Sequence, residues 1–116
     1  MTITIYGIAN CDTMKKARTW LAGHGIEAVF HDYRKAGLAP EKLAAWADAV
    51  GWEKLLNRSG TTFRKLPEAE RSDLTRDRAL GLMLAQPGMI RRPVLETGSG
   101  LVVGFRPDLY AATFPG

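Results

Sequence analysis

The hydrophobic pattern changes its period twice in the first third of the chain. Residues 2–6 (TITIY) are β-branched and aromatic, which predicts a strand. Residues 12–25 predict a helix, because apolar side chains recur there at helical spacing before a pair of glycines. Alternation returns at residues 27–34 and predicts a second strand, parallel to the first in a βαβ unit. The apolar positions of the helix are Met14, Ala17 and Leu21.

Helical periodicity dominates the middle of the chain. Residues 38–51 predict a helix with a proline near its start and a glycine at its end. Residues 52–57 predict a short helix, and residues 74–88 predict another that begins at Leu74 or Thr75. The pattern therefore indicates a helical block inserted between sheet elements.

The last part of the chain predicts a hairpin followed by a helix. Residues 92–97 and 100–105 have the character of strands, and Gly-Ser-Gly separates them. Residues 106–114 predict a terminal helix with a proline in its first turn.

The order of these elements predicts an α/β fold. A parallel βαβ half followed by an antiparallel ββα half describes a thioredoxin-like mixed four-stranded sheet with an inserted helical subdomain. We expect a single domain over residues 1–116, with its core in residues 1–37 and 88–116 and a helical insertion over residues 38–87.

Composition narrows the class of protein. The chain has 116 residues, of which 46% are hydrophobic and 24% charged, as in ordinary soluble domains. Its apolar runs are too short for a membrane span, and the N-terminus lacks the features of a signal peptide. One cysteine excludes an internal disulfide, so we expect a reducing, cytoplasmic location. With one cysteine and only two histidines, His24 and His31, we expect no metal site.

The formal net charge of +4 comes from basic residues scattered among acidic ones. Such a balance is typical of a solvated surface. The more specific alternative is a groove in which converging basic side chains attract an anionic substrate. There is no recognised nucleic-acid motif, so we expect no nucleic-acid partner.

Cys11 is the candidate nucleophile. It lies where the first strand ends and the helix begins, so unpartnered backbone N–H groups and the helix dipole would stabilise its thiolate. Position 14 holds methionine where a C-x-x-C protein has its second cysteine, so an external thiol must resolve any adduct on Cys11. Asn10 would donate a hydrogen bond to the sulfur or serve only the turn.

Four segments of the chain together resemble the family of arsenate reductases (ArsC), Spx and YffB proteins. The segments are YGIANCDTMKKARTWL, LLNRSGTTFRKL, MIRRPVL and VVGFRPDLY. They occur in the family's order and approximate spacing, and the first two are most similar to the YffB branch.

The resemblance implies a catalytic Cys11 with arginines around it. It places Arg92 on the family's arginine before a proline, Pro93 on a proline that is usually cis, and Arg106 on a second family arginine. A third arginine follows a Leu-Leu pair in arsenate reductases, whereas here it comes one position later, at Arg58. Planar guanidinium groups bind oxyanions and carboxylates through paired hydrogen bonds.

Three functions follow as hypotheses. The first is a glutathione-dependent thiol reductase with no tightly bound cofactor, acting as a monomer on a small anionic substrate, with glutathione or a glutaredoxin-type protein as the resolving thiol. The second is an arsenate reductase coupled to glutaredoxin. The third is a regulator like Spx that binds RNA polymerase, and the missing C-x-x-C disfavours it. An inert fold without catalysis is a further alternative.

Overall fold

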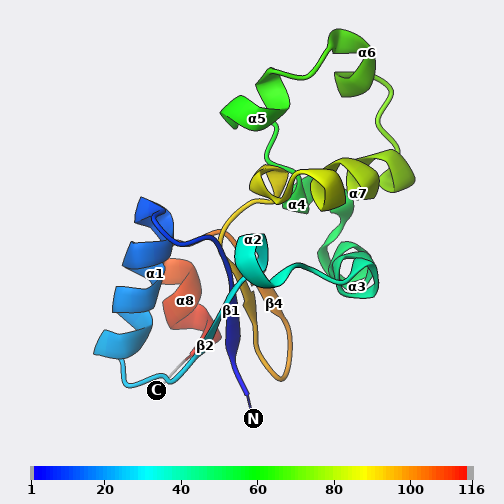
Figure 1. Cartoon of the computed structure of the whole chain (residues 1–116). Coiled ribbons are helices and arrows are strands. Elements are labelled where there is room, and N and C mark those ends of the chain that lie inside the picture. The colour runs from blue at the N-terminus through cyan, green and yellow to red at the C-terminus, as the bar shows by residue number, and fades with distance from the viewer. Residues whose placement is uncertain (1, 115–116) are drawn as a thin grey trace. The chain divides into compact units, whose positions relative to one another are not determined.

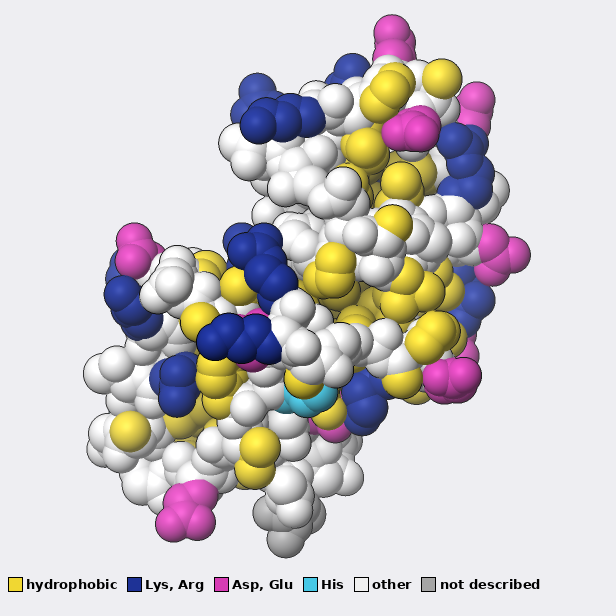
Figure 2. Space-filling view, viewed as in Figure 1, with side chains coloured by type: hydrophobic (Ala, Val, Ile, Leu, Met, Phe, Trp, Pro, Cys, Tyr) yellow, Lys and Arg dark blue, Asp and Glu magenta, His cyan; other side chains and the backbone are white. Residues whose placement is uncertain are grey.

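The computed structural model describes residues 2–114. The chain forms two compact units. The first combines the chain up to Ala36 with the chain from Arg92 onwards, and the second is Gly37–Arg91. No helix among the described residues is long and apolar enough to cross a membrane. On the face seen in Figure 2, basic and acidic side chains are interspersed, as the sequence pattern indicates.

The first unit contains a mixed four-stranded sheet in the order β2-β1-β3-β4 (Figure 1). β1 pairs in parallel with β2, whereas β3 is antiparallel to both β1 and β4. This confirms the predicted βαβ unit, the hairpin and the thioredoxin-like arrangement. The elements are β1 (Thr4–Gly7), α1 (Asp12–Gly23), β2 (Val29–Asp32), α2 (Tyr33–Ala36), β3 (Val94–Glu96), β4 (Leu101–Val103) and α8 (Pro107–Thr113).

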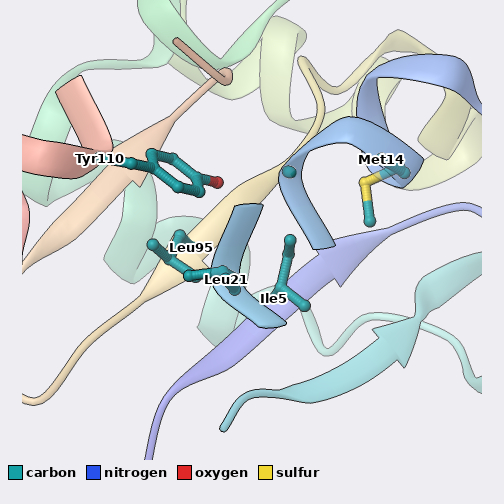
Figure 3. Close-up of a cluster of buried hydrophobic side chains, with 6 residues drawn as sticks. Ile5, Met14, Leu21, Leu95 and Tyr110 are labelled. Atoms are coloured by element: carbon teal, nitrogen blue, oxygen red, sulfur yellow. The ribbon is translucent and has the colours of Figure 1, made fainter. Parts of the chain in front are cut away.

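The core of this unit lies between one face of the sheet and the helices α1 and α8 (Figure 3). Ile5 and Leu95 are register partners on neighbouring strands, so their side chains are on the same face. Both helices therefore cover that face. The helix positions predicted to be apolar are the three buried positions of α1. The six core residues are Ile5, Met14, Ala17, Leu21, Leu95 and Tyr110.

Gly7 allows α1 to pack closely on β1. A Cβ atom at Gly7 would contact Sδ of Met14 and lie 2.7 Å from its Cε. Met14 is itself buried, with 2% of its surface exposed, so it has little room to move. We expect Gly7→Ala to lower the free energy of unfolding by about 1–3 kcal/mol through overpacking. Chemical denaturation measures this, and Gly23→Ala, which meets nothing within 4 Å, should be neutral or stabilising.

The strand predicted over residues 27–34 is wrong at its end. β2 stops at Asp32, and Tyr33 and Arg34 belong to the short helix α2. The physical reason is local, because Oδ1 of Asp32 accepts hydrogen bonds from the backbone N–H groups of Arg34 and Lys35, at 3.0 and 3.3 Å. Such capping by an aspartate starts a helical turn and ends the strand.

The second unit is helical, as predicted for the middle of the chain. Thr75 opens α7, since its hydroxyl accepts the N–H of Arg78 at 3.3 Å. α4 ends before Leu56, which instead forms an isolated antiparallel bridge with Ile90. The short helices α5 and α6 were not predicted from the sequence. The elements are α3 (Pro40–Val50), α4 (Trp52–Leu55), α5 (Thr61–Arg64), α6 (Glu68–Arg71), α7 (Arg76–Ala85) and the 3-10 helix η1 (Pro87–Met89).

Candidate active site

Cys11 is the residue immediately before α1 and has an extended backbone, with φ −117° and ψ 126°. It is a half-buried free thiol. Asn10, just before it, adopts a left-handed conformation with φ 62°, which asparagine tolerates better than most residues. This sharp turn carries the chain from the end of β1 into the start of α1. The sulfur therefore lies at the N-terminal end of the helix, as the sequence pattern indicates.

The surroundings of Cys11 favour its thiolate. Partial burial raises the pKa of the thiol, but three groups act in the opposite direction. The backbone N–H of Met14 lowers the pKa most, the nearby Arg92 lowers it further through its N–H groups and its positive charge, and the backbone N–H of Thr13 adds a weaker contribution. The balance holds the pKa below the ordinary value of 9.0. A lowered pKa increases the fraction of the thiol that is present as the nucleophilic thiolate at a given pH.

A cavity of about 210 Å³ opens beside Cys11, with two arginines in its wall. It is smaller than the roughly 300–1,000 Å³ of pockets for drug-sized ligands. It therefore suits a small anion or one end of a larger molecule. No acidic residue is among the residues that line it within the described part of the chain. The lining residues are Ile8, Ala9, Asn10, Cys11, Arg34 and Arg92.

Arg34 was missed in the sequence analysis. It lies on α2 and is exposed at its surface, and it shares the cavity with Cys11 and Arg92. β1 and β2 are parallel, and their last residues, Gly7 and Asp32, are register partners. The segments that follow the two strands therefore meet at the same edge of the sheet. The parallel pairing of the first two strands was predicted from the sequence. It could have identified Arg34 as a candidate, because it places the residues after the second strand near Cys11.

Arg92 reaches the cavity from the segment that precedes β3. The Arg92–Pro93 peptide bond is cis, as the family resemblance implies. Pro93 is buried, and its carbonyl oxygen accepts the backbone N–H of Gly104 at 2.8 Å. Pro93 thus supports the position of Arg92 and does not itself line the cavity.

Arg106 and Arg58 are not among the residues that line the cavity. Arg106 precedes α8 on an exposed surface, where its Nη2 is 2.8 Å from Oδ2 of Asp108. This ion pair raises the pKa of Arg106 and lowers that of Asp108. Arg58 belongs to the second unit, where its guanidinium lies 5.4 Å from the centre of the Trp52 ring. Their roles as binding residues stay predictions.

A larger cavity of about 960 Å³ runs between α1 and the edge formed by β1 and β2. Its wall includes apolar side chains such as Ile3 and Val29 together with Arg18, but not the cysteine. Within residues 2–114, no group of three or more His, Cys, Asp or Glu side chains is placed to hold a metal ion. The cysteine in the smaller cavity can, as a thiolate, attack an electrophilic sulfur or the central atom of an oxyanion.

The lowered pKa of Cys11 links stability to pH. A group whose pKa is lower in the folded state contributes stability that is complete above its unfolded pKa and is lost as the pH falls through its folded pKa. We therefore expect the reduced protein to gain stability relative to Cys11→Ser as the pH rises toward 9.0. Denaturation of both proteins across this range measures the difference, and parallel curves would contradict the lowered pKa.

Comparison with known proteins places the chain among relatives of similar length. An uncharacterized protein of Haemophilus influenzae is 41% identical over 112 residues, which cover 97% of this chain and 98% of that protein. The structure of a YffB protein is 57% identical with a TM-score of 0.92, and the match covers 96% of this chain and 97% of that one.

A second solved structure is that of an arsenate reductase (ArsC) related protein from Brucella melitensis. It is 59% identical with a TM-score of 0.81, and the match covers 100% of this chain and 97% of that one. The sequence profile of the ArsC family matches residues 6–113, which include both Cys11 and Arg92. The chain belongs to the ArsC family and is similar to its YffB-type members.

Proposed function

We propose that this protein is a glutathione-dependent thiol reductase with Cys11 as its single nucleophile. The observation that carries the proposal is the shared cavity, in which Arg92 lowers the pKa of Cys11 and Arg34 adds a second positive charge. The two guanidinium groups can attract a negatively charged disulfide compound, and the thiolate beside them can attack its disulfide bond.

The reaction has two thiol–disulfide exchanges. The Cys11 thiolate attacks the glutathione sulfur of a mixed disulfide, R–S–SG, and releases the substrate thiolate, which takes up a proton. The thiolate of a second glutathione then attacks the Cys11–glutathione disulfide, forms oxidised glutathione and regenerates the Cys11 thiolate. In the net exchange, R–S–SG and one glutathione thiol become R–SH and oxidised glutathione, so the sulfur of R is reduced and the sulfur of the incoming glutathione is oxidised. A glutaredoxin-type protein is the alternative resolving thiol.

The arginines provide the binding chemistry. Glutathione carries two carboxylates, and guanidinium groups bind carboxylates through paired, charge-assisted hydrogen bonds. The cavity is too small for the whole tripeptide, so the rest of the molecule would lie along the outer surface. Arg106 would join the site if the ligand carboxylate displaced Asp108. Asn10 is a further binding residue in this proposal, and Pro93 supports Arg92, whereas the role of Arg58 stays a prediction from the family resemblance.

Arsenate is a second candidate substrate. The small volume of the cavity and its two arginines suit a compact tetrahedral oxyanion. The structural relative from Brucella melitensis is described as related to arsenate reductase. In this variant, the Cys11 thiolate attacks the arsenic atom and displaces an oxygen, which leaves as water after protonation. Two external thiols then form one disulfide, supply the two electrons that release arsenite, and regenerate the Cys11 thiolate.

Titration followed by NMR, together with turnover assays, tests the proposal and ranks the two ligands. We expect a glutathione mixed disulfide to be reduced with glutathione as electron donor. We expect added glutathione to shift the amide signals of residues 9–14, 34 and 92. If arsenate shifts these signals and is reduced while the mixed disulfide is not, the arsenate variant is correct. If neither compound binds or reacts, the proposed function is wrong.

A further inference from the structure

The larger cavity, beside α1, is separate from the candidate active site. None of Cys11, Arg34 and Arg92 lines it, and all the residues that do belong to the first unit. Its volume of about 960 Å³ lies within the roughly 300–1,000 Å³ of pockets that hold drug-sized ligands. The cavity is therefore large enough for a ligand of its own.

The middle of this cavity is apolar. Ile5 and Leu21, which are buried in the core, form its floor (Figure 3). Half-buried Ile3 and Ala28 line it as well. Val29, the first residue of β2, also belongs to the wall and exposes 57% of its surface, which is unusual for a large hydrophobic side chain in the described part of this chain. A ligand with an apolar chain would remove this surface from water, which is favourable.

Two basic side chains of α1 enter the wall of the cavity. Lys15 and Arg18 are exposed, and within residues 2–114 neither side chain forms an ion pair with a carboxylate. The guanidinium carbon of Arg18 lies over the ring of Phe30 on β2, 4.5 Å from its centre. This cation–π contact holds the guanidinium between helix and strand and leaves its N–H groups to bind an anion.

The charges of the cavity are arranged along its length. α1 connects the parallel strands β1 and β2, so it runs in the direction opposite to theirs. Lys15 and Arg18, in the first two turns of α1, therefore lie toward the ends of the strands, whereas Glu27 precedes β2 and lies where the strands begin. The three side chains leave one net positive charge, which suits a single carboxylate, and Glu27 would repel that group from its own end.

We propose that this cavity binds an amphipathic carboxylate, a small molecule with one acidic group and an apolar chain. The carboxylate lies at Lys15 and Arg18, and the chain lies along the apolar wall toward Val29. A guanidinium group binds a carboxylate through paired, charge-assisted hydrogen bonds, and an ammonium group adds a point charge. The site is independent of Cys11 and goes beyond the proposed function.

Titration of the full chain with octanoate, followed by its amide NMR signals, tests the proposal. We expect saturable shifts in residues 2–5, 15–22 and 26–29, but none in residues 34 and 92 of the other cavity. Octan-1-ol has the same chain without the charge and should bind about two- to fivefold more weakly. Arg18→Gln should weaken octanoate binding about two- to fivefold and leave octanol binding unchanged. Val29→Ser should weaken the binding of both compounds about two- to threefold.

Lys16→Gln is the matched control for charge. Lys16 is likewise an exposed basic residue of α1, but it does not line the cavity, so its substitution should leave the affinity for octanoate unchanged. All three substituted residues are exposed, and thermal unfolding checks that the variants are folded. The proposal is overturned if octanoate causes no saturable shifts, or shifts residues 34 and 92 instead. It is also overturned if octanol binds as tightly as octanoate, or if Lys16→Gln weakens binding as much as Arg18→Gln.

Discussion

Cys11→Ser should abolish turnover with glutathione as electron donor. Serine is not ionised near neutral pH and forms no disulfide, so neither exchange step can take place. We expect the rate to fall by at least about a thousandfold, to the level of the uncatalysed reaction. The measurement is the reduction of a glutathione mixed disulfide, coupled to the formation of oxidised glutathione.

The substitution should leave the fold intact. Cys11 precedes α1, and serine is a favoured residue at that position of a helix. Circular dichroism and thermal unfolding check that Cys11→Ser is folded. If the folded variant keeps its activity, Cys11 is not the nucleophile and the assignment of the site fails.

Arg92→Gln should produce the second largest loss. Glutamine keeps a polar side chain but removes the positive charge that lowers the pKa of Cys11 and that would bind the anionic partner. We expect turnover at neutral pH to fall about 10- to 100-fold, and part of the loss should be recovered at higher pH, where the thiolate forms without Arg92. A pH–rate profile of the variant separates the two effects.

Arg91→Gln is the control for charge alone. Arg91 is the adjacent residue and is exposed, and its Nε donates a hydrogen bond to the Lys54 carbonyl oxygen at 3.2 Å. It does not line the cavity at Cys11, so its substitution should change turnover little. Equal losses in the two variants would mean that net surface charge, rather than the position of Arg92, matters.

The fold was predictable where local periodicity and burial agree. α1 is amphipathic with three apolar positions on one face, and those positions are the ones that the structure buries. α2 was missed because the side chain of Asp32, rather than any apolar repeat, ends β2 and starts the helical turn. The four-residue helices α5 and α6 are too short for a period to be recognised.

The bridge between Leu56 and Ile90 shows the same limit. Residues 52–57 have the composition of a helix, but Leu56 and Asn57 lie outside α4 and pair with the segment around Met89. The backbone N–H of Asn57 donates to the Met89 carbonyl at 2.8 Å, and that of Arg91 donates to the Leu55 carbonyl at 2.7 Å. The spacing of hydrophobic residues along the chain does not reveal a pairing between residues so far apart in the sequence.

The sequence by itself identified the candidate nucleophile, because a lone cysteine between a strand and a helix is a local feature, and the family motifs added Arg92. Only the tertiary structure decided what surrounds the sulfur. The parallel pairing of β1 with β2 brings the turn after β2 to the beginning of α1, so Arg34 enters the cavity that Cys11 and Arg92 line. Helix and strand propensities depend on neighbours along the chain, whereas pKa values and ligand contacts depend on neighbours in space.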